Sequence, residues 1–216
     1  MHKSITNLNL IKEDLKSKIK NYDKIKIIAV SKTFPIENIL PLIEYGHLEY
    51  GENKVQEAIN KWSNIKTKYP NIKLHLIGKL QTNKVKLAVK LFDYIHSVDS
   101  EKLARKIADE QKKINKIIKI FIQVNIGDED QKSGVNKDKL VNLVSYCKEI
   151  KLNLVGLMCI PPVNSDPLEY FRDMSLLNRD YCLPELSMGM SSDYLKASQN
   201  SATYLRIGAS IFGERS

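Results

Sequence analysis

The stretch Ile117-Ile-Lys-Ile-Phe-Ile-Gln-Val-Asn125 has the composition of a buried β-strand, because it is short, apolar and rich in β-branched residues. Downstream, Lys137 to Glu149 carries apolar residues at helical spacing, and Leu152 to Cys159 is a second short apolar run. A strand, a helix and a strand in this order predict a βαβ unit.

The same alternation continues in both directions and predicts eight strands, each followed by a helical stretch. The predicted strands are Ile25 to Lys32, His47 to Tyr50, Lys73 to Ile77, Tyr94 to Val98, Ile117 to Asn125, Leu152 to Cys159, Glu185 to Met188 and Tyr204 to Ile207. The predicted helices between them are Pro35 to Tyr45, Asn53 to Trp62, Asn83 to Phe92, a helix capped by Ser100 and running to Lys113, Lys137 to Glu149, Asp166 to Asn178 and Ser192 to Ala197.

Eight such units predict an α/β protein, a (β/α)₈ TIM barrel that forms a single domain over residues 1–216. Residues 1–20 are expected to form an additional amphipathic helix packed on the barrel. A doubly wound open sheet is the alternative architecture, but the dinucleotide fingerprint G-x-G-x-x-G, one reason to prefer it, is absent from the sequence.

Composition narrows the class of protein. No apolar run reaches the roughly 20 residues that span a bilayer. The N-terminal segment lacks the apolar core of a secretory signal. Three scattered cysteines fit neither a disulfide framework nor a zinc site, so we expect a cytoplasmic protein without a membrane or metal role.

The net charge of +9 is compatible with a nucleic-acid partner, yet only five of the 34 basic residues are arginine. Scattered lysines are typical of solvated surfaces, and we expect no specific nucleic-acid binding.

Functional residues of a β/α barrel lie at the C-terminal ends of its strands. Lys32 ends the apolar strand Ile27-Ile-Ala-Val-Ser31, which places its ammonium group at the barrel mouth. A lysine with restricted access to water has a lowered pKa, and its neutral amine forms imines with aldehydes. The alternative is a solvated surface charge, as for most lysines here.

Two turns rich in small residues follow the last two strands. They are Ser187-Met-Gly-Met-Ser-Ser-Asp193 and Arg206-Ile-Gly-Ala-Ser-Ile-Phe-Gly213. Both lead into helix starts, whose N–H groups favour anions, and this is the usual phosphate site of the fold. The alternative is that these residues only cap helices and turn the chain.

An aldehyde-capturing lysine and a phosphate site together indicate pyridoxal 5′-phosphate (PLP). Arg206 then has a role, because a buried guanidinium facing the pyridine nitrogen keeps that nitrogen unprotonated. The alternative for Arg206 is an ion pair in the barrel wall with Glu52 or Asp99.

At these residues the chain resembles the single-domain pyridoxal phosphate homeostasis family (YggS/PROSC type), which is related to the N-terminal domain of alanine racemase. The matching segments are Ala29-Val-Ser-Lys-Thr33, Gly51-Glu-Asn53, Val55-Gln-Glu57, His75-Leu-Ile-Gly78, Leu80-Gln-Thr-Asn-Lys84, Lys132-Ser-Gly134, Gly156-Leu-Met158, Ser187 to Asp193, Arg206-Ile-Gly208 and Ile211-Phe-Gly213. Lys54 and Lys79 stand where the family often has other residues, and we interpret both as drift under a lysine-rich composition.

The resemblance implies a PLP carrier that stores, delivers or sequesters the cofactor as a Schiff base on Lys32, without enzymatic activity. The predicted cofactor-binding residues are Lys32, Asn53, His75, Ile77, Met190, Ser191, Arg206, Gly208 and Ala209. PLP-dependent apo-enzymes are the expected recipients, and a monomer is expected. The rival function is a PLP-dependent amino-acid racemase. A further hypothesis is a second, exchangeable PLP site on Lys132, Lys84 or Lys79.

Overall fold

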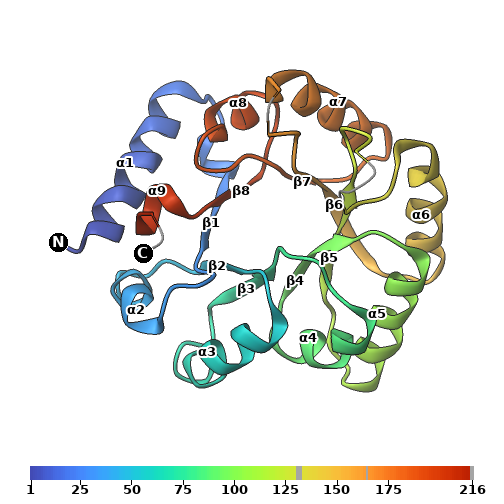
Figure 1. The fold of residues 1–216 in the computed structure, drawn as a ribbon, viewed down its shortest axis with the longest axis horizontal. Helices are drawn as coiled ribbons and strands as arrows, with labels where there is room; N and C mark the ends of the chain where they lie inside the picture. The colour runs from blue at the N-terminus through green and yellow to red at the C-terminus, as the bar shows by residue number, and fades with distance from the viewer. Residues whose placement is uncertain (130–132, 164, 215–216) are drawn as a thin grey trace.

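The computed structural model describes residues 1–129, 133–163 and 165–214, and it shows a closed barrel of eight parallel strands surrounded by helices (Figure 1). Each strand pairs with the next along the chain, and β8 closes the barrel by pairing with β1. The (β/α)₈ prediction is therefore confirmed, and the open-sheet alternative is wrong.

The strands are β1 (Lys26–Val30), β2 (Glu49–Glu52), β3 (Lys73–Leu76), β4 (Tyr94–Val98), β5 (Lys119–Val124), β6 (Asn153–Cys159), β7 (Glu185–Ser187) and β8 (Tyr204–Ile207). The α-helices are α1 (Lys3–Lys18), α2 (Ile36–Glu44), α3 (Val55–Lys68), α4 (Val85–Leu91), α5 (Glu101–Lys113), α6 (Lys137–Glu149), α7 (Pro167–Asp180), α8 (Tyr194–Gln199) and α9 (Ala209–Phe212). Two short 3₁₀ helices, η1 (Tyr22–Lys24) and η2 (Thr82–Lys84), precede β1 and α4.

Alternation of side chains along the strands divides the buried residues into two layers. The larger layer lies between the strands and the helices, and it includes Trp62, Phe92 and Phe171, each fully buried. The smaller layer fills the barrel interior and contains Ile28, Val30, Tyr94, Phe121, Val155, Met158 and Tyr204. The interior is therefore packed, and a ligand is expected at the mouth, as in other barrels of this kind.

Several predicted element boundaries are wrong near β2. The predicted strand His47 to Tyr50 is observed at Glu49–Glu52, because the N–H of His47 still bonds to the carbonyl of Leu42 at the end of α2. The helix predicted to begin at Asn53 begins at Val55, since Lys54 is extended. That helix runs to Lys68 rather than to Trp62.

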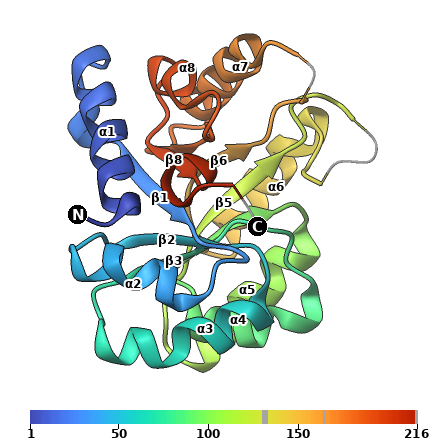
Figure 2. The same ribbon diagram turned by 60° about the vertical axis from the view of Figure 1, so that its left-hand side comes forward.

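The N-terminal helix α1 packs against α9, α2 and α8, as expected for residues 1–20 (Figure 2). The side chain of Asn7 donates to the carbonyl of Ile211 in α9 over 3.0 Å, and Tyr194 in α8 donates to Asp14 over 2.6 Å. Helix α1 therefore holds α8 and α9, the helices that follow β7 and β8, against the barrel. None of the helices in the described residues is long and apolar enough to cross a membrane.

Candidate functional site

A cavity of about 320 Å³ opens at the C-terminal ends of β1, β7 and β8. Its lining consists of Val30, Lys32, Asn53, Ile77, Ile160, Met190, Ser191, Ser192, Arg206, Gly208 and Ala209. Eight of the nine predicted cofactor-binding residues are thus brought together by the fold. The ninth, His75, is fully buried in the barrel interior and does not line this cavity.

Lys32 follows the end of β1 and is half-buried. The next residue, Thr33, has φ 67°, a left-handed conformation that costs energy for a residue with a side chain. The carboxylate of Glu57 accepts a 2.7 Å hydrogen bond from the Thr33 N–H and so holds this sharp turn. The turn fixes where the lysine stem leaves the barrel wall.

The carboxylate of Glu52 connects Ser31, which lies between β1 and Lys32, with the segment that carries Asn53. Glu52 is fully buried, and its Oε1 accepts from Ser31 Oγ at 2.8 Å, from Lys61 Nζ at 2.9 Å and from Trp62 Nε1 at 2.9 Å. A buried ion pair with additional hydrogen bonds is costly to break from one side. The network therefore fixes both sides of the cavity.

Arg206 is 5% exposed and projects from β8 into the barrel. Its Nη1 donates to Ser187 Oγ and its Nη2 to the carbonyl of Cys159, each over 2.8 Å. Burial lowers the pKa of Arg206, although the group stays charged. Glu52 pairs with Lys61 instead, and no ion pair joins Arg206 to Asp99 in the described residues, so the alternative of a wall ion pair is wrong. The guanidinium has only neutral partners there.

The turns after β7 and β8 are bonded to each other. Ser191 Oγ accepts from the N–H of Ser210 at 3.3 Å, and Asp193 Oδ1 accepts from the N–H of Met190 at 2.6 Å. The N–H groups of Ser191, Ser192 and Gly208 make no hydrogen bond within the part of the chain that the structure describes. Together with Arg206 and Lys32, they make this side of the cavity suited to an anion.

A second cavity of about 340 Å³ shares Asn53, Ile77 and Ile160 with the first. Lys79 lines it, together with Gly78, Gln123, Val124, Asn125 and Ser133. Of the lysines in the second-site hypothesis, Lys79 therefore lies beside the main cavity, Lys84 lines neither cavity, and Lys132 lies outside the described residues.

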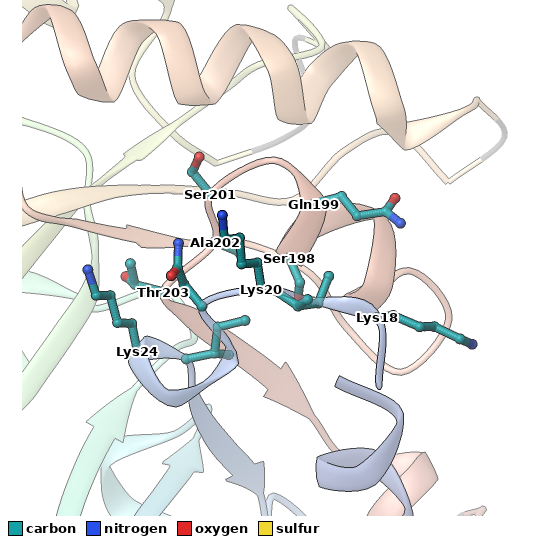
Figure 3. Close-up of a pocket in the computed structure, with 11 residues that line it drawn as sticks. Lys18, Lys20, Lys24, Ser198, Gln199, Ser201, Ala202 and Thr203 are labelled. Atoms are coloured by element: carbon teal, nitrogen blue, oxygen red, sulfur yellow. The ribbon is translucent and has the colours of Figure 1, made fainter. Parts of the chain in front are cut away.

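A third cavity, of about 420 Å³, lies at the other end of the barrel, where β1 and β8 begin (Figure 3). Lys18, Lys20 and Lys24 contribute to it, and Lys18 extends away from the other two in Figure 3 and pairs with Asp14. Lysines at the C-terminal end of α1 complement the negative end of the helix dipole. Helix stability explains the position of Lys18, whereas Lys20 follows the helix and Lys24 lies in η1. Lys32 and Arg206 lie at the other end of the barrel.

Sequence reasoning missed several residues of the site. Val30, Ile160 and Ser192 also line the main cavity, and Ser187 holds Arg206 from behind. Ser187 could have been predicted from the sequence, because it begins the motif Ser187 to Asp193. It lies two residues before Gly189, on the inward face of β7. Among the described residues, no group of three His, Cys, Asp or Glu side chains could hold a metal ion.

Comparison with known proteins places this geometry in a family. Residues 6–216 match the family described as alanine racemase, N-terminal domain. The pyridoxal phosphate homeostasis protein of Haemophilus influenzae is 35% identical, over 97% of this chain and 94% of that protein. The protein of the same name from Aquifex aeolicus is 40% identical, over 88% of this chain and 87% of its own length. The chain belongs to the pyridoxal phosphate homeostasis protein family.

The structure of PipY from Synechococcus elongatus, solved with PLP bound, is similar to this chain over nearly its whole length. It is 32% identical with a TM-score of 0.80, over 93% of this chain and 97% of that chain. D-threonine aldolase from Filomicrobium marinum, 16% identical with a TM-score of 0.75, covers 96% of this chain and 59% of that one, and shows the fold alone. The predicted family and its racemase-like barrel are confirmed.

Proposed function

We propose that this pyridoxal phosphate homeostasis family member binds PLP in the 320 Å³ cavity and holds it as a Schiff base on Lys32. The phosphate would lie in the turns that contain Ser191, Gly208 and Ala209, and the ring would lie between Arg206 and the wall formed by Asn53, Ile77 and Met190. The observation that carries the proposal is that one cavity unites a half-buried lysine, a buried arginine and two phosphate-type turns.

The charges of the cavity fit such a ligand. Burying a guanidinium whose described partners are all neutral is unfavourable, and an acceptor or an anion in the cavity offsets that cost. The N–H groups of Ser191, Ser192 and Gly208, which make no hydrogen bond in the described part of the chain, suit phosphate oxygens. PLP supplies an aldehyde for a lysine amine and a phosphate for such donors.

A carrier rather than an enzyme is favoured by what the cavity contains. Among the lining residues that the structure describes, Lys32 and Arg206 are the ionisable ones. A racemase needs a base on each face of the substrate's α-carbon, and an arginine that stays charged is a poor second base. Storage, delivery and sequestration of PLP need only reversible capture. The expected partners are therefore PLP itself and PLP-dependent apo-enzymes.

The test is to load the purified protein with PLP, record its visible absorption, reduce it with borohydride and map the modified peptide by mass. Modification of Lys32 is expected, with loss of the absorption and of the adduct in Lys32→Ala. Lys54→Ala and Lys79→Ala are matched controls, because Lys54 directly follows Asn53 and Lys79 lines the neighbouring cavity, and neither substitution should change the adduct on Lys32. A wild-type protein that gains no adduct on Lys32 would refute the proposal. A persistent adduct on Lys79 or Lys132 in Lys32→Ala would instead establish the second site.

Incubation of the loaded protein with L- or D-alanine, followed by chiral analysis, separates the carrier from the racemase. No turnover is expected, and rapid formation of the other enantiomer would favour the racemase. We further propose that the protein is a cytoplasmic monomer without specific nucleic-acid binding. Free thiols at Cys147, Cys159 and Cys182 fit a reducing compartment. Size-exclusion chromatography and a gel shift at moderate salt test the other two points.

A further inference from the structure

A continuous line of hydrogen bonds crosses the barrel interior behind the proposed PLP site. Arg206 Nη1 lies 2.8 Å from Ser187 Oγ, which lies 2.9 Å from His96 Nδ1. His96 Nε2 lies 2.9 Å from His75 Nδ1, and His75 Nε2 lies 2.6 Å from Glu49 Oε2. Glu49 is the first residue of β2, so the line runs from the cavity to the opposite end of the barrel.

The two ends of this line determine its direction. A guanidinium can only donate, so Ser187 Oγ accepts from Arg206, and an ionised carboxylate can only accept, so His75 donates to Glu49. The serine hydroxyl and two neutral imidazoles then supply one proton for each remaining bond. Ser187 donates to His96 Nδ1, His96 Nε2–H donates to His75 Nδ1, and His75 carries its proton on Nε2. Every proton of the line points away from the cavity.

Burial supports this protonation state. His75 and His96 are both fully buried, and desolvation lowers the pKa of each imidazole, which favours the neutral forms. Burial is the largest single effect on Glu49 and raises its pKa, but the bond from His75 and the charges of His75, Lys26 and His47 together lower it below the ordinary value. The surrounding charges are those of Lys26, His47 and Asp93 near Glu49 and His75, and of Arg206 near His96.

Ring stacking holds both imidazoles in the planes that these bonds require. His96 stacks on Phe121 with a centroid distance of 4.2 Å and an angle of 16°, and His75 stacks on Tyr94 at 4.2 Å and 14°. A flipped ring would keep the stack but lose its hydrogen bonds, and a buried polar group without a partner is costly. The arrangement is therefore specified by packing and by hydrogen bonding together.

We propose that Ser187 and His96 are positioning residues, parts of a one-directional relay that holds the Arg206 guanidinium in place and withholds protons from the cofactor side. This inference rests on the proposed PLP function. Arg206 has no proton to release at neutral pH, and a guanidinium accepts none from Ser187, so no proton passes along this line to the cofactor side. The ring nitrogen facing Arg206 then stays unprotonated, which suits a carrier because such a ring is a weak electron sink.

The first test reads the relay without any cofactor. Nitrogen-15 NMR of histidine-labelled apo-protein at neutral pH distinguishes the two neutral tautomers and the charged ring, and the chain has four histidines to assign. His75 and His96 are both expected as the neutral Nε2–H tautomer. A Nδ1–H tautomer or an imidazolium at either position would overturn the assigned direction. This result is independent of whether PLP binds.

The second test asks whether the relay acts on the cofactor. Ser187→Ala removes the hydroxyl between Arg206 and His96, and loss of a hydrogen bond to a charged group predicts about tenfold faster release of PLP. The absorption band of the bound cofactor should shift as well, because the guanidinium facing the ring becomes less ordered. Ser187→Thr retains the hydroxyl and should restore both properties.

Ser97→Ala is the matched control, because Ser97 is 1% exposed on the neighbouring outward position of β4 and its hydroxyl has no hydrogen-bond partner among the described residues. The control should behave as wild type. If Ser187→Ala matches Ser97→Ala in both PLP release and absorption, Ser187 is only a packing residue and the positioning role is refuted. If wild-type protein gains no adduct on Lys32, the proposed function fails while the NMR result still decides the direction of the relay.

Discussion

Gly78 lies so close to Asn53 that a Cβ on Gly78 would be 2.3 Å from the Asn53 carbonyl oxygen and 2.8 Å from its Cα. Gly78→Ala should therefore displace Asn53, which lines both cavities at the mouth. Overpacking of this kind predicts a loss of ~1–3 kcal/mol in the free energy of unfolding, measured by denaturant titration, together with weaker PLP binding.

Gly46→Ala is the control for that prediction. Gly46 has φ 94°, and a Cβ at this position would meet no atom within 4 Å, so its substitution strains the backbone without a steric clash and far from the cavity. A loss of ~1 kcal/mol with unchanged PLP binding is expected. Equal effects of both substitutions on PLP binding would show that Gly78 matters only through overall stability.

Glu52→Gln should destabilise the protein because it leaves the ammonium of Lys61, whose side chain is 9% exposed, with only the part-exposed carboxylate of Glu57 at 3.2 Å as counter-charge. Breaking one side of a buried pair predicts a loss of ~3 kcal/mol in unfolding free energy. Ser31→Ala removes a single neutral donor to the same carboxylate with little loss of volume and predicts about 1 kcal/mol. The two losses are measured by urea titration, and a larger loss for Ser31→Ala would contradict the role assigned to the ion pair.

Thiol reactivity should divide the three cysteines. Burial raises the pKa of both Cys147 and Cys159 to about 12, whereas Cys182 is exposed. The thiolate is the reactive form, so a thiol reagent added to native protein should label Cys182 quickly. Labelling of Cys147 and Cys159 should require unfolding. Fast labelling of Cys159 in native protein would mean that the strand behind Arg206 opens more readily than its burial indicates.

Stability should decline as the pH falls from 6.5 to about 4. Burial lowers the pKa of His47 to about 4 and lowers the pKa values of His75 and His96, so the unfolded chain binds protons that the folded chain resists. The stabilisation is complete above the unfolded pKa and is lost as the pH falls below it, with a slope of up to ~1.4 kcal/mol per pH unit for each histidine. Urea titrations across this range measure the slope. A flat profile would show that these histidines titrate alike in both states.

The sequence predicted the barrel because apolar strands and helical spacing repeat eight times, and each repeat is a local signal. Predicted boundaries agree with the structure where a strand or helix is bounded by local chemistry, as for Tyr94–Val98, Tyr204–Ile207 and the Ser100 cap of α5. They disagree at β2, where pairing with β3 as far as Glu52 extends the strand beyond its apolar residues. Such pairing depends on residues distant in sequence.

The cavity residues could be predicted because they follow strands that are recognisable in the sequence. The hydrogen bonds inside the barrel were not predicted. His75 belongs to a motif of the sequence, yet its partners Glu49 and His96 come from other strands, so the sequence alone did not reveal the relay. The assignment of His75 to the ring pocket stays a prediction. In the structure His75 is buried in the barrel interior, linked to Arg206 through His96 and Ser187, and it does not line the cavity.

The pairing of β8 with β1 has a consequence for how the protein is made. Lys32 is synthesised early, whereas Arg206 and Gly208 emerge from the ribosome about 170 residues later. A nascent chain therefore carries the proposed Schiff-base lysine long before it carries the arginine and the turn proposed to complete the PLP site. Tight capture of the cofactor should begin only once β8 has paired with β1, so a loaded molecule is also one whose barrel has closed.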